Sequence, residues 1–345
     1  MKRWDADKAN AWYSSQPWLV GCNFIPSTAI NQMEMWQSET FDIPTMEKEL
    51  GWAADMGMNT VRVYLHDLAW DLDASGFKSR LDLFLRLAAH RGLRPILVIF
   101  DDCWNANPKA GRQPEPIPGA HNSGWLQSPG NAIVNDPSAW RRLEQYVQDV
   151  VGTFRHDDRV LLWDLYNEPG NNQQVEQSLP LLCKVFEWAR KAEPSQPLTA
   201  GLWFNNTILN TFQVEASDVI TFHNYNAADD LNAQIRKLRP YGRPLICTEW
   251  LRRGHSDVAS CLPVFCQEGV GCCNWGLVNG KTQTIYPWAW EKVADTPGPA
   301  VWFHDLLQQD GTPFDPEEVR LFKKLTEAGR AQQYSPPYVS PGGSL

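Results

Sequence analysis

The sequence has no uninterrupted run of about 18 apolar residues, the length that a membrane-spanning helix needs. Its N-terminal stretch, MKRWDADKANAWYSSQPW, also lacks the apolar core and the small-residue cleavage site of an export signal. We therefore expect a protein that does not insert into a membrane and that works in the cytoplasm.

Positive charge is scarce as well. Lysine and arginine together number 31 against 40 acidic residues, which leaves a formal charge of −9. An acidic surface repels nucleic acids and anionic lipids, so neither is expected as the main partner. A neutral or cationic ligand fits this balance better.

Motifs that would point to other classes of protein are missing too. No CxxC pair suggests a structural zinc site, and no GxGxxG follows the first predicted strand, as a dinucleotide-binding sheet would require. The eight cysteines are scattered, and several lie within predicted buried strands, so we expect reduced thiols. We expect no cofactor and no metal ion.

Aromatic residues, in contrast, are abundant, with 17 tryptophans in 345 residues. Flat, amphipathic indole rings stack against the apolar faces of sugars, although part of this set must simply fill the core. The composition therefore favours a carbohydrate as the ligand.

Short apolar runs alternate with longer amphipathic stretches along most of the chain. The runs predict eight strands, at 18–26, 60–66, 94–100, 160–169, 196–203, 218–225, 243–250 and 269–280.

Helical patterns separate these runs. One begins near Pro44 and ends at Gly57, another ends at Gly92, and a third starts behind Asp136 as its N-cap. Eight such units predict a (β/α)8 TIM barrel in a single domain over 18–330, with a lead-in segment at 1–17 and a loose tail at 331–345. A doubly wound open sheet is the structural alternative.

Two of the predicted strands end in a glutamate, Glu168 in YNEP and Glu249 in CTEW. The ends of strands four and seven face each other across the mouth of a barrel. Two carboxyl groups about 5 to 5.5 Å apart are what a retaining glycosidase needs, one holding a proton and the other ionised.

Further residues at strand ends make a family resemblance specific. Asn167 precedes Glu168, Arg62 lies in the second strand, and His223 and Tyr225 lie at the end of the sixth. In this order they resemble the clan A glycoside hydrolases, and among them glycoside hydrolase family 5, the cellulase and mannanase family, over roughly 18–326.

The resemblance implies Glu168 as general acid/base, Glu249 as nucleophile, and Asn167 as a partner of the sugar 2-hydroxyl. Arg62 and Tyr225 would hold Glu249 ionised by charge and hydrogen bonding. The remaining two implied contacts are His223 beside the acid/base and Trp275 as the floor under the reacting sugar ring.

The chain departs from the family at the end of the third strand, where many members carry a histidine and this sequence reads FDDCW. A loop of about 30 residues follows, and long loops inside a compact domain are usually functional. The segments after strands one, three and five supply further predicted sugar contacts, namely Asn23, Glu34, Trp36, Asp101, Asp102, Trp104, His121, Asn122 and Trp203. Either aspartate could instead cap a turn.

The function that these residues predict is a retaining β-glycosidase acting on β-linked hexosides or short oligosaccharides. The long third loop favours a blocked cleft and exo action, and an endo-β-1,4-glucanase or mannanase is the alternative. A carbohydrate-binding protein on a disabled scaffold would have lost a glutamate, a metal-dependent hydrolase would show familiar histidine spacing, and a transglycosidase shares the first step. The sequence leaves the hexose and the oligomeric state open.

Overall fold

The computed structural model describes residues 2–288 and 298–333. Its eight strands are parallel and follow the order β5-β4-β3-β2-β1-β8-β7-β6 in one sheet. Their bounds are β1 Val20–Asn23, β2 Thr60–Tyr64, β3 Arg94–Val98, β4 Leu162–Asp164, β5 Leu198–Thr199, β6 Ile220–His223, β7 Leu245–Trp250 and β8 Gly271–Asn274.

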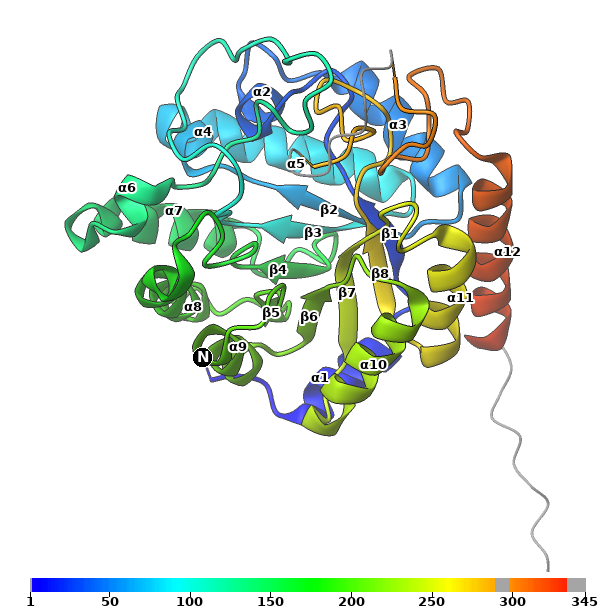
Figure 1. Ribbon diagram of the computed structural model, residues 1–345. Coiled ribbons are helices and arrows are strands. Elements are labelled where there is room, and N and C mark those ends of the chain that lie inside the picture. Colours follow the sequence, from blue (N-terminus) through cyan, green and yellow to red (C-terminus); the bar gives the residue numbers. More distant parts are fainter. Residues whose placement is uncertain (1, 289–297, 334–345) are drawn as a thin grey trace, which may run out of the picture.

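The two ends of this order come together, because a single parallel bridge joins Leu202 after β5 to Phe222 on β6. The sheet is thus a nearly closed barrel, and helices surround it (Figure 1). The prediction of a (β/α)8 TIM barrel is confirmed.

The helices alternate with the strands along the chain. They are α1 Ala6–Ser14, α2 Gln32–Trp36, α3 Ile43–Asp55, α4 Asp67–Leu72, α5 Ala74–His90, α6 Asn131–Val134, α7 Trp140–Thr153, α8 Leu179–Lys191, α9 Thr207–Ala216, α10 Ala228–Leu238, α11 Val258–Glu268 and α12 Pro316–Gln333. Three short 3-10 helices lie at Pro137–Ala139, Val175–Ser178 and Arg239–Tyr241. Among the described residues, no helix is long and apolar enough to cross a membrane.

Local signals explain where the helices stop and start. The Asp42 carboxylate accepts a hydrogen bond from the Thr45 N–H and caps α3, which has Pro44 in its first turn. Gly57 and Gly92 follow α3 and α5 with φ angles of 89° and 71°, a conformation that glycine adopts without strain. The predicted N-cap Asp136 starts a 3-10 turn that leads into α7.

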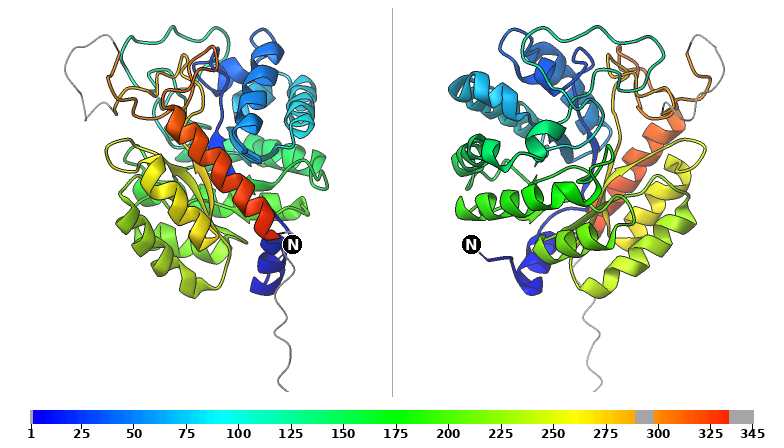
Figure 2. Two further views of the ribbon diagram at one scale, coloured as in Figure 1. Left: turned by 90° about the vertical axis from the view of Figure 1, so that its right-hand side faces the viewer. Right: turned by 60° about the vertical axis from the view of Figure 1, so that its left-hand side comes forward.

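The lead-in segment contains α1, which covers the end of the barrel opposite the long loops (Figure 2). Trp12 and Tyr13 pack there against a buried apolar cluster made by Leu19, Ile96, Leu161, Leu162, Val219, Ile246 and Cys273. At the other terminus α12 continues to Gln333, past the predicted boundary at 330. The rest of the predicted tail, 334–345, lies outside the described residues.

All eight cysteines, each within the described part of the chain, are free thiols, as expected.

Candidate active site

Glu168 stands four residues beyond β4, where the chain turns out of the barrel. Its φ of 44° is unusual for a residue with a side chain, and such backbone conformations concentrate at functional sites. The turn is held from below, because the buried Asp102 carboxylate accepts hydrogen bonds from the Gly170 N–H at 2.9 Å and the Tyr166 hydroxyl at 2.7 Å. The Glu168 side chain is 13% exposed.

Glu249 lies on β7 and has three strong donors. One carboxylate oxygen accepts from the Arg62 guanidinium and the Tyr64 hydroxyl, both at 2.8 Å, and the other accepts from the Tyr225 hydroxyl at 2.8 Å. Burial raises the pKa of both tyrosines well above 10, so they stay protonated and donate. These contacts favour an ionised Glu249 carboxylate.

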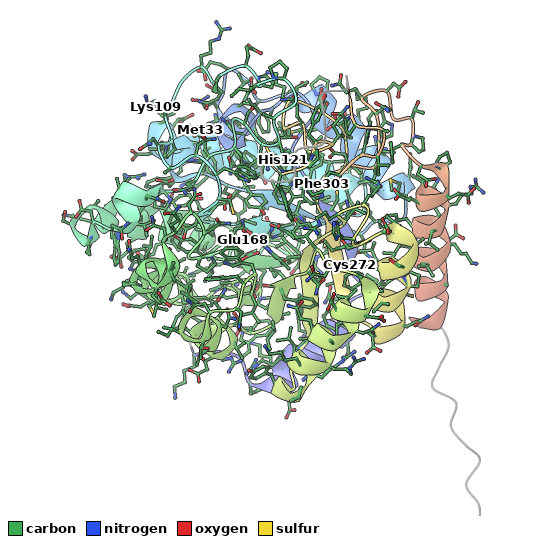
Figure 3. The ribbon with its side chains drawn as sticks, viewed as in Figure 1. Met33, Lys109, His121, Glu168, Cys272 and Phe303 are labelled. Atoms are coloured by element: carbon green, nitrogen blue, oxygen red, sulfur yellow. The ribbon has the colours of Figure 1, made fainter. Side chains whose placement is uncertain are left out.

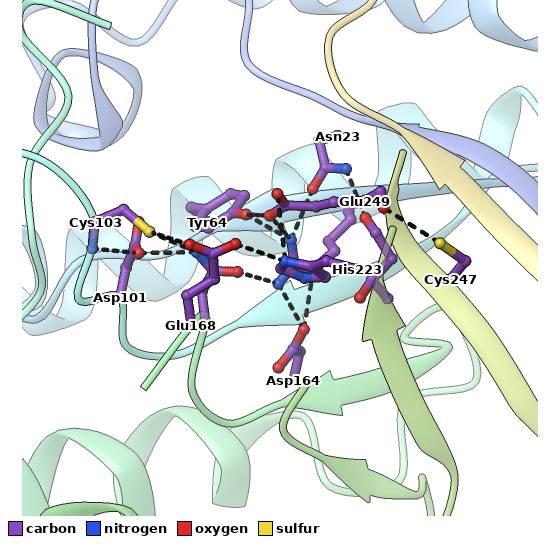
Figure 4. A network of polar contacts seen from close by, with 12 residues as sticks. Asn23, Tyr64, Asp101, Cys103, Asp164, Glu168, His223, Cys247 and Glu249 are labelled. Atoms are coloured by element: carbon purple, nitrogen blue, oxygen red, sulfur yellow. Dashed lines mark hydrogen bonds and ion pairs between the residues drawn. The ribbon is translucent and has the colours of Figure 1, made fainter. Parts of the chain in front are cut away.

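His223 connects the two glutamates (Figure 4). Its Nδ1 lies 2.8 Å from Glu168 Oε1 and 3.4 Å from Glu249 Oε2. One ligand-type atom from each of the three side chains lies within 4.8 Å of the other two, so the two carboxylates are close neighbours at the barrel mouth. Glu168 occupies the interior in Figure 3, with His121 and Phe303 in the loops above it.

The environment of Glu168 combines burial with three hydrogen-bonding neighbours. Burial alone would raise its pKa, but the hydrogen bond and charge of His223 outweigh it, with further help from Cys103 and Asn171. The pKa of Glu168 is therefore held below its usual value. The Cys103 thiol lies 3.2 Å from Oε2 and stays protonated, because burial raises its own pKa well above 9.

Asn167 is fixed by charged groups on both sides of its amide. Its oxygen accepts from Arg62 at 2.7 Å, and its nitrogen donates to Asp101 Oδ1 at 2.9 Å. The other Asp101 oxygen accepts from the Trp125 indole at 2.7 Å. Burial raises the pKa of Asp101 to about 7.

A pocket of about 930 Å³ opens above the two glutamates. Ten of the predicted site residues line it: Trp104, His121, Asn122, Asn167, Glu168, Trp203, His223, Tyr225, Glu249 and Trp275. Its wall also carries Cys103, Asn171, Phe204, Asn205, Lys237 and Tyr241. The structure thus brings together most of the residues that the sequence predicted.

Several predicted residues hold the site in place from behind it. Arg62 is fully buried and bonds Asp164, Asn167 and Glu249. Asn23 accepts from Arg62 at 2.9 Å and donates to the Thr248 carbonyl.

Asp101 and Asp102 were predicted as sugar contacts, and the structure contradicts this. Both are at most 1% exposed, and their oxygens already accept protein hydrogen bonds. They support Asn167 and the turn after Glu168 instead, because a buried carboxylate needs its donors close by.

Trp36 and Glu34 lie outside the pocket as well, against prediction. Trp36 is completely buried, packs against Phe77 and Phe84, and donates its indole N–H to the Tyr64 carbonyl. Glu34 pairs with Lys281 at 2.7 Å and so ties α2 to the segment after β8. The short helix α2, most of whose residues are buried, directs the two side chains into the core and the loop contact.

Three residues of the site were missed by the sequence reasoning. Tyr64 lies two residues beyond Arg62 on β2, and this period-two spacing placed it on the same face. Asp164 binds Arg62 at 2.8 Å from within the predicted fourth strand. Nothing in the sequence singled out Cys103 as a neighbour of Glu168.

Among the described residues, Glu168, His223 and Glu249 form a group whose spacing would also suit a metal ion. All three already take part in direct hydrogen bonds of 2.8 Å, Glu168 with His223 and Glu249 with Arg62. The chemistry proposed below needs no ion there.

Comparisons with solved structures show the same fold. An exo-beta-1,4-mannosidase from Opitutaceae bacterium strain TAV5 has a TM-score of 0.64 at 16% identity, over 92% of this chain and 60% of its own length. A variant of GH5_18 from Streptomyces cattleya in complex with Manb1-4GlcNAc has a TM-score of 0.60 at 13% identity, over 94% of this chain and 83% of its own length. An endo-1,4-beta-D-mannanase from Thermotoga petrophila RKU-1 has a TM-score of 0.57 at 13% identity, over 90% of this chain and 99% of its own length.

No curated protein sequence matches the chain. The family model described as cellulase (glycosyl hydrolase family 5) matches residues 21–281, which is most of the barrel. The strand-end glutamates, the pocket and this match agree, and the chain belongs to glycosyl hydrolase family 5 as an O-glycosyl hydrolase.

Proposed function

We propose that the protein is a retaining, exo-acting β-glycosidase that removes single hexosyl units from the non-reducing end of short β-linked oligosaccharides or glycosides. The observation that carries the proposal is the pair of carboxylates at the ends of β4 and β7, with oxygens within 4.8 Å of each other. This spacing suits direct attack by one carboxylate rather than a water held between the two.

The two carboxylates have different surroundings, which assigns their roles. Glu249 faces Arg62, Tyr64 and Tyr225 and is the ionised nucleophile that attacks the anomeric carbon. Glu168 protonates the leaving oxygen and then, as a base, activates the water that releases the sugar. Asn167, held by Arg62 and Asp101, is positioned to bind the 2-hydroxyl.

The pocket itself suits a sugar. Trp275 lines it with 9% of its surface exposed, a flat face for the pyranose ring. Asn122 also lines the pocket, but both polar atoms of its side chain are buried and have no partner among the described residues, so they could bind a sugar only after the side chain moves.

The wall on one side of the pocket supports exo action. The loop after β3 and the segment after β8 are tied by hydrogen bonds from Asn122 N–H to the Thr282 carbonyl at 2.9 Å and from the Gln283 amide to the Ile117 carbonyl at 2.7 Å. His121 bonds the Tyr286 carbonyl at 2.8 Å. In the proposed exo mode, these joined loops limit the room for further sugars beyond the reacting ring.

The pocket also extends past the acid/base. Beyond Glu168 the pocket continues past Trp203 and Phe204 to Lys237 and Tyr241, between α9 and α10. Because the acid/base protonates the leaving oxygen, the leaving group belongs on this side. A closed glycone side and an open leaving-group side are what exo action from the non-reducing end requires.

Endo action on glucan or mannan is the second candidate, since solved structures of the same fold include an endo-mannanase. β-1,4-linked gluco- and manno-pentaoses labelled at the reducing end distinguish the two. Exo action shortens the labelled chain one unit at a time and releases unlabelled monosaccharide, whereas early labelled di- and trisaccharides would refute it. A Glu249→Ala variant serves as the blank, and a panel of aryl β-glycosides identifies the hexose.

A further inference from the structure

The general acid presents a protonation problem. Glu168 must hold a proton when it meets the substrate, yet His223 and two further neighbours keep its pKa below the usual value. Glu168 and His223 are hydrogen-bonded at 2.8 Å, so the contacts of the second ring nitrogen of His223 affect how well Glu168 holds its proton.

That second nitrogen, Nε2, is buried. It has no hydrogen-bond partner among the described residues, and the His223 side chain is only 2% exposed. A buried ring nitrogen without a partner is costly, and in proteins such groups are usually satisfied by an ordered water.

Gly201, just beyond β5, leaves space at this nitrogen. A β-carbon on Gly201 would lie 3.4 Å from His223 Nε2, 3.4 Å from Thr221 Oγ1 and 3.6 Å from Thr248 Oγ1. Three polar atoms from β6 and β7 thus surround the one position where the neighbouring segment carries no side chain.

The two threonines can complete a hydrogen-bonded set. Thr199 Oγ1 donates to the Val219 carbonyl, so the contact of 2.8 Å between Thr199 and Thr221 uses the hydrogen of Thr221. Thr221 Oγ1 then offers only lone pairs. Thr248 Oγ1 is buried and has no partner among the described residues.

We propose that a water molecule bound by Thr221, Thr248 and His223 Nε2, in the space beside Gly201, keeps a proton on Nε2 and so retains the shared proton on the Glu168–His223 pair. The water accepts from Nε2–H and donates to Thr221. With Nε2 protonated, Nδ1 either accepts from a protonated Glu168 or, as imidazolium, donates to ionised Glu168. In both states the pair carries the proton that the leaving oxygen takes.

Without that acceptor the histidine would place its single proton on Nδ1 and face an ionised Glu168. Other titratable groups around the imidazole act on this equilibrium but not through Nε2. They are Glu168 and Asp164 from β4 and its loop, Glu249 from β7, Tyr225 beyond β6, Cys103 after β3 and Arg62 from β2. The inference rests on the proposed function, and Gly201, Thr221 and Thr248 are positioning residues.

Gly201→Ala tests this, because the added methyl fills the space at ordinary contact distances and offers no acceptor. With an aryl glycoside that has a poor leaving group, the upper limb of the kcat/KM profile moves at least one pH unit lower. A good leaving group, which needs no proton, keeps its plateau. Gly201→Ser places a hydroxyl beside Nε2 and moves the limb back toward the wild-type position.

Thr248 offers a matched pair if the glycine variants fold poorly. Thr248→Val keeps the shape and loses the hydroxyl, so the limb moves lower, whereas Thr248→Ser keeps the hydroxyl and the wild-type profile. The proposal is overturned if the pH profile of Gly201→Ala superimposes on that of the wild type. It is also overturned if the upper limb moves equally far in the alanine and serine variants.

The tautomer provides a readout that needs no turnover. In ¹⁵N-histidine-labelled protein, with the His223 signals identified by a His223→Gln variant, Nε2 is protonated in the wild type and loses its proton in Gly201→Ala. An unprotonated Nε2 in the wild type refutes the water site alone. Absence of any leaving-group dependence in the wild-type profile would instead refute Glu168 as the acid.

Discussion

Single side chains decide the division of labour between the two glutamates. Glu249 is surrounded by the cationic Arg62 and two phenol donors, so its negative charge is stabilised at every oxygen. Glu168 shares hydrogen bonds with an imidazole that can itself carry the proton. In the proposed mechanism Glu249 therefore acts as the ionised carboxylate, and Glu168 acts as the acid together with His223.

Removing the proton donor should affect substrates according to their leaving groups. For Glu168→Ala, we expect a loss of about 10²- to 10⁴-fold in the glycosylation step for alkyl glycosides or disaccharides, the range typical of general acid catalysis. Dinitrophenyl glycosides, whose leaving group needs no proton, should lose little in that step. Pre-steady-state release of the leaving group measures it, and equal losses for both substrate classes would exclude Glu168 as the acid.

At this scale the sequence predicted which residues meet at the barrel mouth better than it predicted which buried residues hold them in place. Glu168, Glu249 and His223 follow predicted strands at the barrel mouth, so their meeting could be expected from topology alone. Tryptophan and aspartate are residue types that often bind sugars. Where the side chains of Trp36 and Asp102 point, however, depends on the fold of α2 and on the turn after β4. Residue type and position in the chain do not determine whether a carboxylate faces a pocket or a buried N–H group.

Secondary-structure elements position the loops that shape the pocket. Glu49 on α3 is fully buried, and its carboxylate accepts hydrogen bonds from the N–H and hydroxyl of Ser27, in the loop after β1. Lys281 in the segment after β8 donates its N–H to the Ser27 carbonyl. Through these contacts α3 holds the segment after β8, which forms part of the pocket wall, in place.

The buried Glu49 should make stability depend on pH. Burial raises its pKa to about 7, above the value of about 4.3 in an unfolded chain. The stabilising protonated form is thus lost as pH rises through 7, at a cost of about 1 kcal/mol between pH 6 and 8. Relative to Glu49→Gln, which stays neutral, the wild type should lose that amount of free energy of unfolding between pH 6 and 8.

Urea unfolding at pH 6 and pH 8 measures this difference. Glu47→Gln, on the exposed face of the same helix, is the control and should show no such change. A difference between wild type and Glu49→Gln that is the same at both pH values would mean that Glu49 does not change its charge in this range.

The elements themselves were predictable in number but not in length. All eight predicted strands exist, because parallel strands buried on both faces read as continuous apolar runs. The fourth was predicted at 160–169 and pairs only over Leu162–Asp164. Beyond it the backbone of Leu165 and Asn167 still makes single hydrogen bonds to the neighbouring chain segments before the turn at Glu168. Apolar content does not report where the regular ladder ends.

The molecule as a whole has two differently built ends. Long loops form the mouth, while α1 covers the opposite end and packs its aromatic side chains there. Trp4 is 4% exposed, and its backbone N–H donates to the Asp218 carboxylate at 2.8 Å. We therefore expect the segment at 1–17, which carries no predicted site residue, to contribute to stability.

Trp4→Ala should lower the free energy of unfolding by about 3 to 5 kcal/mol, as for other large-to-small core changes. The kcat and KM at 25 °C should stay unchanged, because the altered side chain lies at the far end from the mouth. Ser14→Ala, at an exposed position of α1, serves as control. Thermal unfolding with activity assays measures both, and a Trp4→Ala variant as stable as the control would contradict this role for the lead-in segment.

The barrel and the location of its active centre followed from the order of strands and strand-end residues. The closure of one side of the pocket did not, because it depends on hydrogen bonds between loops far apart in sequence, such as those of Gln283 with the loop after β3. A sequence shows which loops are long and polar, but not which of these loops contact each other.

The most direct test of the central claim is the anomeric configuration of the product that azide forms with Glu249→Ala. Loss of the nucleophile should nearly abolish turnover of an activated aryl β-glycoside, and azide, occupying the space of the missing carboxylate, should restore turnover. Proton NMR should then show the α-glycosyl azide, the inverted product. A β-glycosyl azide, or undiminished hydrolysis without azide, would contradict Glu249 as nucleophile.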